Sequence, residues 1–448
     1  MWSVLIPVAA LFLIILTPLP KIGGEVRLGL LTAAILAFLL GGVGPGTAVL
    51  AAVDGIDRIA WVIGLSIFGS IYAQSQVSLG TMDTVLNIFR ALFGHSPNGL
   101  VAAVLLTLVL AGSLLGDAIA SVTVIGVLVV LSLAELGLTP EQTGVVVLLG
   151  GILGSIMPPI TQAFFLASSL VGTPVDPVVN IGYFTVSVGV IVGLFTVWRY
   201  VHIKELPPEL IPERSTGQIL AQEWPRLLPL IVLAGIVVLR SGFKVELLKV
   251  LDPLLPFAKT PILKALTNRI IQAIIVATMV AFAFRDVRRD TAQIFRKGLA
   301  AVSKTVQIQL CAGVMIGAFY ASGMIDRVVA FTKGLAPAAV KLGGAGAMLL
   351  TGMLTGSQTT SQNTLMPFLG PILTHNLGVP PVKVALGAAH LAMAGQSMPP
   401  VCLTTFVVVG IVGGILAKKV DPVRVMLMAL PVTVYFALVG LAAWFQVF

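Results

Sequence analysis

The sequence predicts an all-α polytopic membrane protein with two inverted repeats, each holding a broken helix and a re-entrant helical hairpin. Three observations lead to this prediction. The chain is 57% hydrophobic and only 10% charged, whereas soluble domains carry about 25% charged residues. Apolar runs of about 20 residues, enough to cross a bilayer, recur from end to end. Finally, a polar break and a Met-Pro-Pro break each occur twice at nearly the same spacing.

The apolar runs do not alternate with polar residues, as strands of a membrane barrel would. Several of them are too short to span a membrane alone, and such segments in matching positions of two halves indicate a transporter binding site. The runs fall near 2–19, 28–53, 59–76, 98–115, 119–136, 143–157, 160–172, 179–199, 227–239, 269–284, 306–321, 336–354, 365–377, 382–397, 401–417 and 424–447.

Two polar stretches, 202–226 and 285–298, divide the chain. The second is strongly basic, which favours the cytoplasmic side, and the net charge of +9 fits basic cytoplasmic loops. We therefore expect four regions. They are N-terminal scaffold helices with an amphipathic arm (1–97), transport elements of the first repeat (98–200), a linker with interfacial and scaffold helices and a second arm (201–335), and transport elements of the second repeat (336–448).

Other features limit the class of protein. The first segment lacks a basic region before it, so it predicts a signal anchor or first spanning helix rather than a cleaved signal peptide. Cys311 and Cys402 stand in apolar surroundings and predict small core residues. The glycines at 41–49 precede no phosphate-binding motif, and there is no ATP-binding motif elsewhere. Transport would therefore draw on an ion gradient.

The internal repeat is clearest in LGLTPEQTGVVVLLGGILGSIMPPITQAFFLASSLVG (136–172) and LGVPPVKVALGAAHLAMAGQSMPPVCLTTFVVVGIVG (377–413). In both, a glycine stands twenty positions before the Met of Met-Pro-Pro and another stands fifteen positions after it. Upstream, LAGSLLGDAIASVTVIG (110–126) and LTGSQTTSQNTLMPFLG (354–370) each hold a polar break marked by glycine. This agreement in spacing indicates duplication.

Each kind of break should have its own geometry. Two consecutive prolines end a helix or fold it into a hairpin, so we expect a hairpin bent at Met-Pro-Pro beside a helix broken at the polar motif. Non-helical backbone at membrane depth persists only where protein buries it or a cavity adjoins it. Half-helix N-termini attract anions, and half-helix C-termini offer carbonyl oxygens to cations.

The polar cluster at 357–363 predicts a substrate site, because hydroxyls and amides recognise a polar solute without the cost of a buried ion. Hydrogen bonding between packed helices is the alternative, but a cluster at a repeat-matched break favours binding. Residues flanking the Met-Pro-Pro breaks would complete the site. The predicted substrate-binding residues are Ser357, Gln358, Thr359, Thr360, Ser361, Gln362, Asn363, Gln396, Ser397, Thr404, Thr161 and Gln162.

Asp117 lies inside the first polar break, where a charge costs roughly 2.5–3.5 kcal/mol on insertion scales. Such a residue needs a role: a cation ligand, a proton carrier or the cap of a half-helix. A lone histidine such as His390 is more often a hydrogen-bonded packing residue. The residues at the breaks that we predict to bind a cation, sodium or potassium, are Gly116, Asp117, Ser121, Gly356, Pro158 and Pro399, with the ion near Asp117.

The paired motifs resemble those of the ion transporter superfamily. Within it, the chain from about Leu110 onward is most similar to the large membrane subunit of TRAP (tripartite ATP-independent periplasmic) transporters, especially those with TAXI-type binding proteins. This resemblance implies an elevator in the prokaryotic inner membrane, in which a transport domain slides against a scaffold. It also implies Na⁺-coupled uptake of a small organic acid, a small four-helix membrane subunit and a periplasmic substrate-binding protein.

Some features depart from that pattern. TAXI-type large subunits are commonly fused to the small subunit, for which this chain has little room, so the small subunit is separate or the protein works alone. GSQTTSQN is also similar to GSDTSSN of lactate permeases, which work alone and with protons, although glutamine here replaces aspartate. No arginine falls in either break, so an anionic substrate would depend on helix ends and hydroxyls.

Two other classes of function, a passive channel and an intramembrane enzyme, compete with a carrier. A passive channel usually repeats one pore element around an axis across the membrane, whereas this chain has two halves with two kinds of break. An intramembrane aspartyl protease would need a second membrane aspartate. We therefore expect a carrier, not an enzyme, with no resident cofactor and no nucleic-acid partner. Lipids surround it, and homodimerisation stays open.

Overall fold

The computed structural model describes residues 2–16, 25–243, 245–254, 259–332 and 334–448, and every regular element within them is a helix. Six of these described helices are long and apolar enough to cross a membrane, or seven if the bent pair α19 (Pro422–Met428) and α20 (Leu430–Trp444) forms one span. The predicted all-α polytopic membrane class is thereby confirmed. The six are α5 (Pro97–Leu115), α6 (Ala118–Glu135), α9 (Val175–Trp198), α10 (Thr216–Phe243), α13 (Thr291–Ala321) and α15 (Pro337–Thr355).

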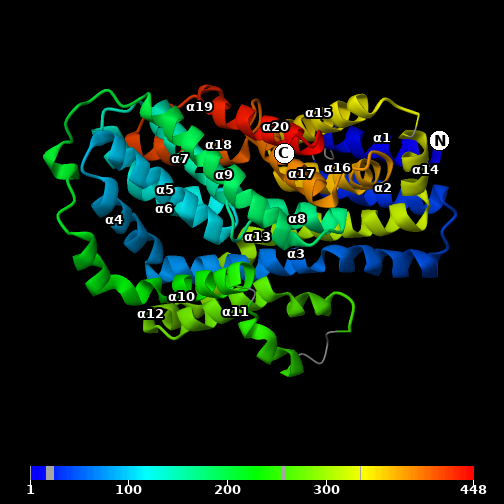
Figure 1. The fold of residues 1–448 in the computed structure, drawn as a ribbon, viewed down its shortest axis with the longest axis horizontal. Helices are drawn as coiled ribbons and strands as arrows, with labels where there is room; N and C mark the ends of the chain where they lie inside the picture. The colour runs from blue at the N-terminus through cyan, green and yellow to red at the C-terminus, as the bar shows by residue number, and fades with distance from the viewer. Residues whose placement is uncertain (1, 17–24, 244, 255–258, 333) are drawn as a thin grey trace.

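The longest helices, α3 (Pro45–Leu79) and α13, pack along each other, and α3 runs along much of the molecule (Figure 1). Glycine permits this approach, because a Cβ at Gly55 would lie 2.0 Å from the carbonyl oxygen of Gly313. Two helix pairs flank them: α1 (Trp2–Leu16) with α2 (Val26–Leu40), and α10 with α11 (Arg269–Phe282). We call these helices the scaffold.

The remaining long elements form a second group, in the same order in each half of the chain. The first half has α5, α6, α7 (Pro140–Ile156), α8 (Gln162–Val171) and α9, and the second has α15, α16 (Gln358–Pro371), α17 (Pro381–Gln396), α18 (Leu403–Leu416) and α19 with α20. Short helices connect the groups. These are α4 (Thr81–Phe93), α12 (Arg285–Arg289), α14 (Met324–Thr332), the 3-10 helices Pro208–Leu210, Leu247–Leu254 and Leu263–Thr267, and the π-helix Ile372–Asn376.

The structure reverses the predicted geometry of the two kinds of break. Helix α5 packs along α6, and α15 packs along α16, so the polar breaks are hairpin tips. By contrast, α17 and α18 do not pack along each other, and α7 meets α8 only near their junction. The Met-Pro-Pro segments therefore interrupt a helix. The reason is local: a left-handed glycine followed by an extended residue turns the chain back within two residues.

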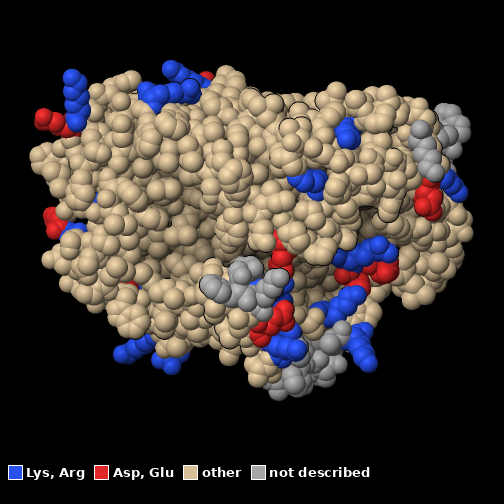
Figure 2. All heavy atoms as spheres, viewed as in Figure 1, with Lys and Arg blue, Asp and Glu red and all other residues tan. Residues whose placement is uncertain are grey.

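The surface agrees with a membrane environment. Figure 2 shows one face with broad areas free of charged side chains, and the charges lie at its edges, in one mixed group in its lower middle and at a few isolated points. Large apolar side chains are exposed on the helices, among them Phe184 at 73% and Leu50 at 72%. Patches of this extent indicate contact with lipid or another apolar partner. The division into four regions is not tested by these observations and stays a prediction.

Candidate functional site

The two hairpin tips and the two broken helices meet around one polar cavity of about 110 Å³. The tips reach it from α6 and α16, and the half-helices reach it with the ends of α7 and α17 and the starts of α8 and α18. The cavity is lined by Asp117, Ala118, Ile119, Ser155, Gln162, Thr305, Ile308, Gly356, Ser357, Gln358, Thr359, Gln396, Leu403 and Thr404.

The first hairpin tip is built on Gly116 and Asp117. Gly116 has a φ of 67°, which glycine adopts without steric cost. Asp117 caps α6, since its Oδ1 accepts a 2.7 Å hydrogen bond from the backbone N–H of Ala120, and the residue stays exposed to the cavity. The N–H of Ile160 donates to the carbonyl of Ser113 at 3.1 Å, which ties the first Met-Pro-Pro break to this tip. Asp117 thus both caps a helix and lines the cavity.

The second tip repeats this design with a neutral cap. Gly356 has a φ of 62°, and Oγ of Ser357 accepts a 3.2 Å hydrogen bond from the N–H of Thr360. The N–H of Gln358 donates to Oε1 of Gln396 at 2.8 Å. A Cβ at Gly356 would lie 3.1 Å from the backbone nitrogen of Leu403. This tip is therefore pressed against both ends of the second broken helix.

The deeper part of the polar cluster lies behind the cavity, on α16. Ser361 donates to the carbonyl of Met348 on α15 at 2.8 Å. This residue therefore makes a hydrogen bond between packed helices, the alternative to substrate binding. Gln362 is fully buried, and neither of its side-chain amide atoms has a hydrogen-bond partner. Asn363 donates to the carbonyl of Thr359 at 2.9 Å, but its Oδ1 is likewise buried without a partner. Buried amide atoms in this state favour ordered water or a bound solute nearby.

The cavity therefore gathers only part of the predicted site. The predicted residues that line it are Asp117, Gln162, Gly356, Ser357, Gln358, Thr359, Gln396 and Thr404. Those that do not line it are Thr360, Ser361, Gln362, Asn363, Ser397, Thr161, Gly116, Ser121, Pro158 and Pro399. Sequence reasoning missed Thr305 and Ile308 of α13, because nothing in the pattern of a long scaffold helix marks the turn that faces the site.

The residues outside the cavity have structural surroundings of their own. Ser121 and Ser397 donate to carbonyls of their own helices, Ala118 at 2.9 Å and Met393 at 2.8 Å. Thr161 is fully buried without a side-chain partner. The two breaks match in backbone, with cis peptide bonds at Pro158-Pro159 and Pro399-Pro400.

His390 is a packing residue, as its sequence context indicated. It is fully buried. Its Nδ1 lies 2.9 Å from the carbonyl of Leu386, and its Nε2 lies 3.1 Å from Oγ1 of Thr185. The rings of Phe164 and Phe436 lie against it. It does not line the cavity, so a direct part in binding has no support in this geometry.

A second cavity of about 50 Å³ adjoins the first and shares Asp117, Gln162 and Thr305 with it. Its other walls are scaffold residues of α3 and α13 together with the first tip and break. They are Leu65, Ser66, Gly69, Ser70, Ala73, Gln74, Leu115, Gly116, Ala120, Ile160, Ala301 and Val302. The polar space thus continues between the hairpin tip and the scaffold.

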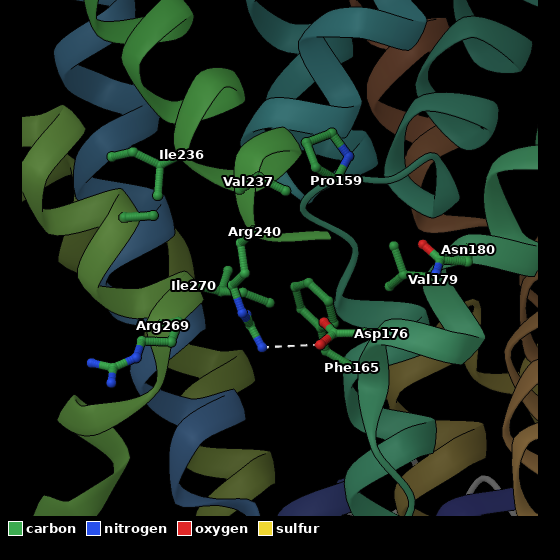
Figure 3. Close-up of a pocket in the computed structure, with 11 residues that line it drawn as sticks. Pro159, Phe165, Asp176, Val179, Asn180, Ile236, Val237, Arg240, Arg269 and Ile270 are labelled. Carbon is green, nitrogen blue, oxygen red and sulfur yellow. Dashed lines mark hydrogen bonds and ion pairs between the residues drawn. The ribbon is translucent and has the colours of Figure 1, made fainter. Parts of the chain in front are cut away.

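A third cavity lies where α10 and α11 of the scaffold meet α8 and α9, and about 20 Å³ leaves room for little more than water. In Figure 3, Arg240 reaches from α10 to Asp176 at the start of α9. Their atoms Nη2 and Oδ2 are 3.0 Å apart. Phe165 and Pro159 complete the apolar side of the cavity. This ion pair joins the scaffold to the second group of helices.

Within the described residues, no group of three or more His, Cys, Asp and Glu side chains could hold a metal ion. The cavity wall instead offers one carboxylate, neutral hydroxyl and amide groups, and the ends of half-helices. Alkali cations accept carbonyl, hydroxyl and carboxylate oxygens at such ends. No Lys or Arg side chain lines this cavity. A negative ligand would therefore be held by helix N-termini and neutral donors.

A polar cavity between two hairpin tips and two broken helices in a helical membrane protein is typical of a secondary transporter. The sequence matches the family described as "Tripartite ATP-independent periplasmic transporter, DctM component" over residues 8–447. This chain therefore belongs to that family, which confirms the resemblance seen in its motifs. Membership identifies a transporter of the TRAP class in the inner membrane, in systems that include a small membrane subunit and a periplasmic binding protein.

Solved structures show the same fold at low sequence identity. The YdaH transporter of Alcanivorax borkumensis, described as having an unusual topology, aligns with a TM-score of 0.60 and 14% identity, covering 100% of this chain and 97% of that one. MtrF of Neisseria gonorrhoeae, described within a class of antimetabolite efflux pumps, aligns with a TM-score of 0.56 and 15% identity, covering 96% and 85%. Comparison with curated proteins found no match.

Proposed function

We propose that this protein is a secondary transporter that takes up a small organic acid together with Na⁺ by an elevator mechanism. The observation that carries the proposal is the cavity itself, because four helices, α6, α8, α16 and α18, begin at its wall and it contains one carboxylate, that of Asp117. Helix N-termini attract anions, and carbonyl-rich C-termini attract cations. A site that binds both an acid and Na⁺ needs both kinds of helix end.

The four N-termini at the cavity are not equivalent. Asp117 and Ser357 cap α6 and α16 with their own side chains. By contrast, neither α8 nor α18 has a side-chain oxygen as its cap, although the thiol of Cys402 lies near the N–H groups of Thr404 and Thr405 at the start of α18. A carboxylate placed between α8 and α18 would accept hydrogen bonds from the first N–H groups of both helices. We assign substrate binding to this pair of N-termini, with Gln358, Gln396 and Thr404 alongside.

We assign the cation to the first hairpin tip. Asp117 brings a formal negative charge to the wall, and the end of α7 at Ser155 lies on the same wall. Partial negative charge at a helix C-terminus adds to the attraction. Na⁺ bound there would offset the charge of an incoming acid, which is one physical basis for symport.

The elevator part of the proposal concerns the two groups of helices. The cavity lies where the hairpins and broken helices face α13 of the scaffold, through Thr305 and Ile308. A site at such a boundary can be carried past a fixed scaffold as a unit. The matched element order of the two halves supports a repeat, and an inverted relation between them would make the two end states alike.

A stand-alone proton-coupled carboxylate permease is the second candidate. The same observation favours it, since the exposed carboxylate of Asp117 could exchange a proton with water in the cavity. A passive channel has less support, because the cavity is small and bounded by helix ends instead of continuing as a lined pore.

Uptake into proteoliposomes of the purified chain, with labelled organic acids and an imposed Na⁺ or H⁺ gradient, tests these readings. Accumulation driven by Na⁺ supports the proposal, and accumulation driven only by H⁺ supports the second candidate. Activity that appears only after adding a binding protein and a small membrane subunit would place the chain in a tripartite system. Dissipative flux without accumulation under any gradient would contradict a coupled carrier.

A further inference from the structure

One hydrogen bond connects the candidate site to the scaffold. Gln162 is the first residue of α8 and lines both the site cavity and the adjoining cavity against α3. Its Nε2 donates to Oγ of Ser66, in the middle of α3, at 3.3 Å. The same amide that faces the ligand space is therefore held by a scaffold residue in this structure.

Ser66 is itself part of a buried polar pair. Its Oγ accepts from Nε2 of Gln309 on α13 at 3.2 Å, lies 3.3 Å from Oε1 of the same side chain, and donates to the carbonyl of Val62 in its own helix at 3.0 Å. Ser66 is 1% exposed and Gln309 is 0% exposed. Burying an amide and a hydroxyl between helices is costly unless they are hydrogen-bonded, and apolar side chains would fill the same space without that requirement. The pair is hydrogen-bonded within the scaffold, and the bond from Gln162 brings a second N–H donor to the same hydroxyl oxygen.

The positions of the pair match in the two halves. Ser66 stands fourteen residues before Gly80, and Gln309 stands fourteen residues before Gly323, and both glycines have a positive φ. The third partner, however, exists in one half only. Gln162 follows Met157 by five positions, and the residue five positions after Met398 is Leu403, which has no polar side-chain atom. The bond to the scaffold is thus a feature of the first half alone.

We infer that Ser66 and Gln309 hold Gln162 while the site is empty and release it when an organic acid binds. This inference rests on the proposed function and adds two positioning residues to it. A carboxylate is a stronger acceptor than a hydroxyl, so a ligand at the N-terminus of α8 competes with Ser66 for the Gln162 amide. The scaffold pair thereby lowers the apparent affinity for substrate and ties the empty site to α3.

The test measures ligand-induced thermal stabilisation of the purified chain, which requires neither a gradient nor a partner. Lactate, pyruvate, succinate and glutamate are titrated separately in NaCl. Ser66→Ala should lower the half-saturating concentration roughly 2- to 10-fold, the effect of losing one competing hydrogen bond. Gln162→Ala should raise the concentration, and Ser66→Ala added to it should change nothing further.

Ser70→Ala is the matched control. Ser70 lies one turn further along α3, lines the same second cavity and donates to the carbonyl of Gly298 at 2.8 Å instead of to Gln162. Its replacement should leave the half-saturating concentration unchanged. An unchanged value for Ser66→Ala, or the same shift with and without Gln162, would overturn the inference, because the pair would then only pack.

The two proposals can fail separately. An acid that stabilises the chain but never accumulates in proteoliposomes would contradict transport. The shift in half-saturating concentration caused by Ser66→Ala, with and without Gln162, would still test the inference. Accumulation without any Ser66 effect would remove only the inference. If none of the four acids stabilises the wild type, the inference fails, because no ligand then competes for Gln162, and uptake into proteoliposomes still decides the proposed function.

Discussion

The tips of the α5–α6 and α15–α16 hairpins share a backbone and differ in chemistry. Each ends with a left-handed glycine followed by a capping residue with a φ near −142°. In the first tip the cap is Asp117 and the next residues are Ala118 and Ile119, whereas in the second Ser357 is followed by Gln358 and Thr359. One tip offers charge and the other offers neutral hydrogen bonds. Duplication would account for the shared geometry, and in the proposed function the charged tip takes the cation and the neutral tip takes the substrate.

The largest expected effect concerns the glycines of the tips. Gly356→Ala should reduce uptake at least tenfold and lower the unfolding temperature, because alanine at positive φ costs about 1–2 kcal/mol and its Cβ would lie 3.1 Å from the backbone of Leu403. Gly116→Ala should cost less, since its nearest neighbour is 3.4 Å away.

Gly172→Ala is the control for the glycine series, with a φ of 75° and no atom within 4 Å of its Cβ position. It isolates the conformational cost from the steric one. Thermal unfolding and uptake are measured together for all three variants. Equal losses of uptake and of unfolding temperature in all three variants would show that the close approach of Gly356 to Leu403 does not contribute to either.

The second prediction tests the charge of the first tip. Asp117→Asn should raise the Na⁺ concentration for half-maximal uptake by roughly tenfold or more, about 1.4 kcal/mol or more of lost cation binding. The protein should stay folded, because asparagine caps helices as well as aspartate does. Na⁺ dependence of uptake is the measurement.

Asp421→Asn provides the matched comparison for Asp117. Asp421 is an exposed cap of α19 whose Oδ1 accepts from the N–H of Val423 at 2.9 Å, and it does not line the cavity. Its replacement should leave the Na⁺ dependence as it was. If Asp117→Asn behaves in the same way, the carboxylate is only a cap.

The third prediction compares two glutamines of the same hairpin. Gln358 lines the cavity and Gln362 does not. Gln358→Ala, which makes the second tip resemble the first, should raise the substrate concentration for half-maximal uptake about 5- to 10-fold through loss of one hydrogen-bonding group. Gln362→Ala should have a smaller effect. The reverse order would move the substrate behind the tip, beside the unpartnered amide of Gln362.

These comparisons also show what the sequence could predict. The positions of all four breaks were correct, because glycine and proline end helices by local sterics alone. Which break forms the hairpin was wrong, since both residue types interrupt a helix and the outcome depends on the left-handed φ of Gly116 and Gly356 and on packing. The hydroxyls of the second tip were found as a cluster. Thr305, Ser66 and Gln309 were not, because a polar residue in a long helix shows its role only once its partner is in place.

The smallest expected effect concerns the two Asp-Pro sequences that close the repeats. Asp176 pairs with Arg240 of the scaffold at 3.0 Å, whereas its counterpart Asp421 only caps a helix. Because the Asp176 and Arg240 side chains are 47% and 26% exposed, the pair contributes about 0.2–1 kcal/mol. Asp176→Asn should therefore change the uptake rate by less than about fivefold, by weakening one contact between α9 and α10.

The charge-reversed pair Asp176→Arg with Arg240→Asp should restore the rate, while Asp421→Asn should leave it unchanged. A change in rate that the reversed pair does not correct would mean that Asp176 acts through the start of α9 and not through the scaffold.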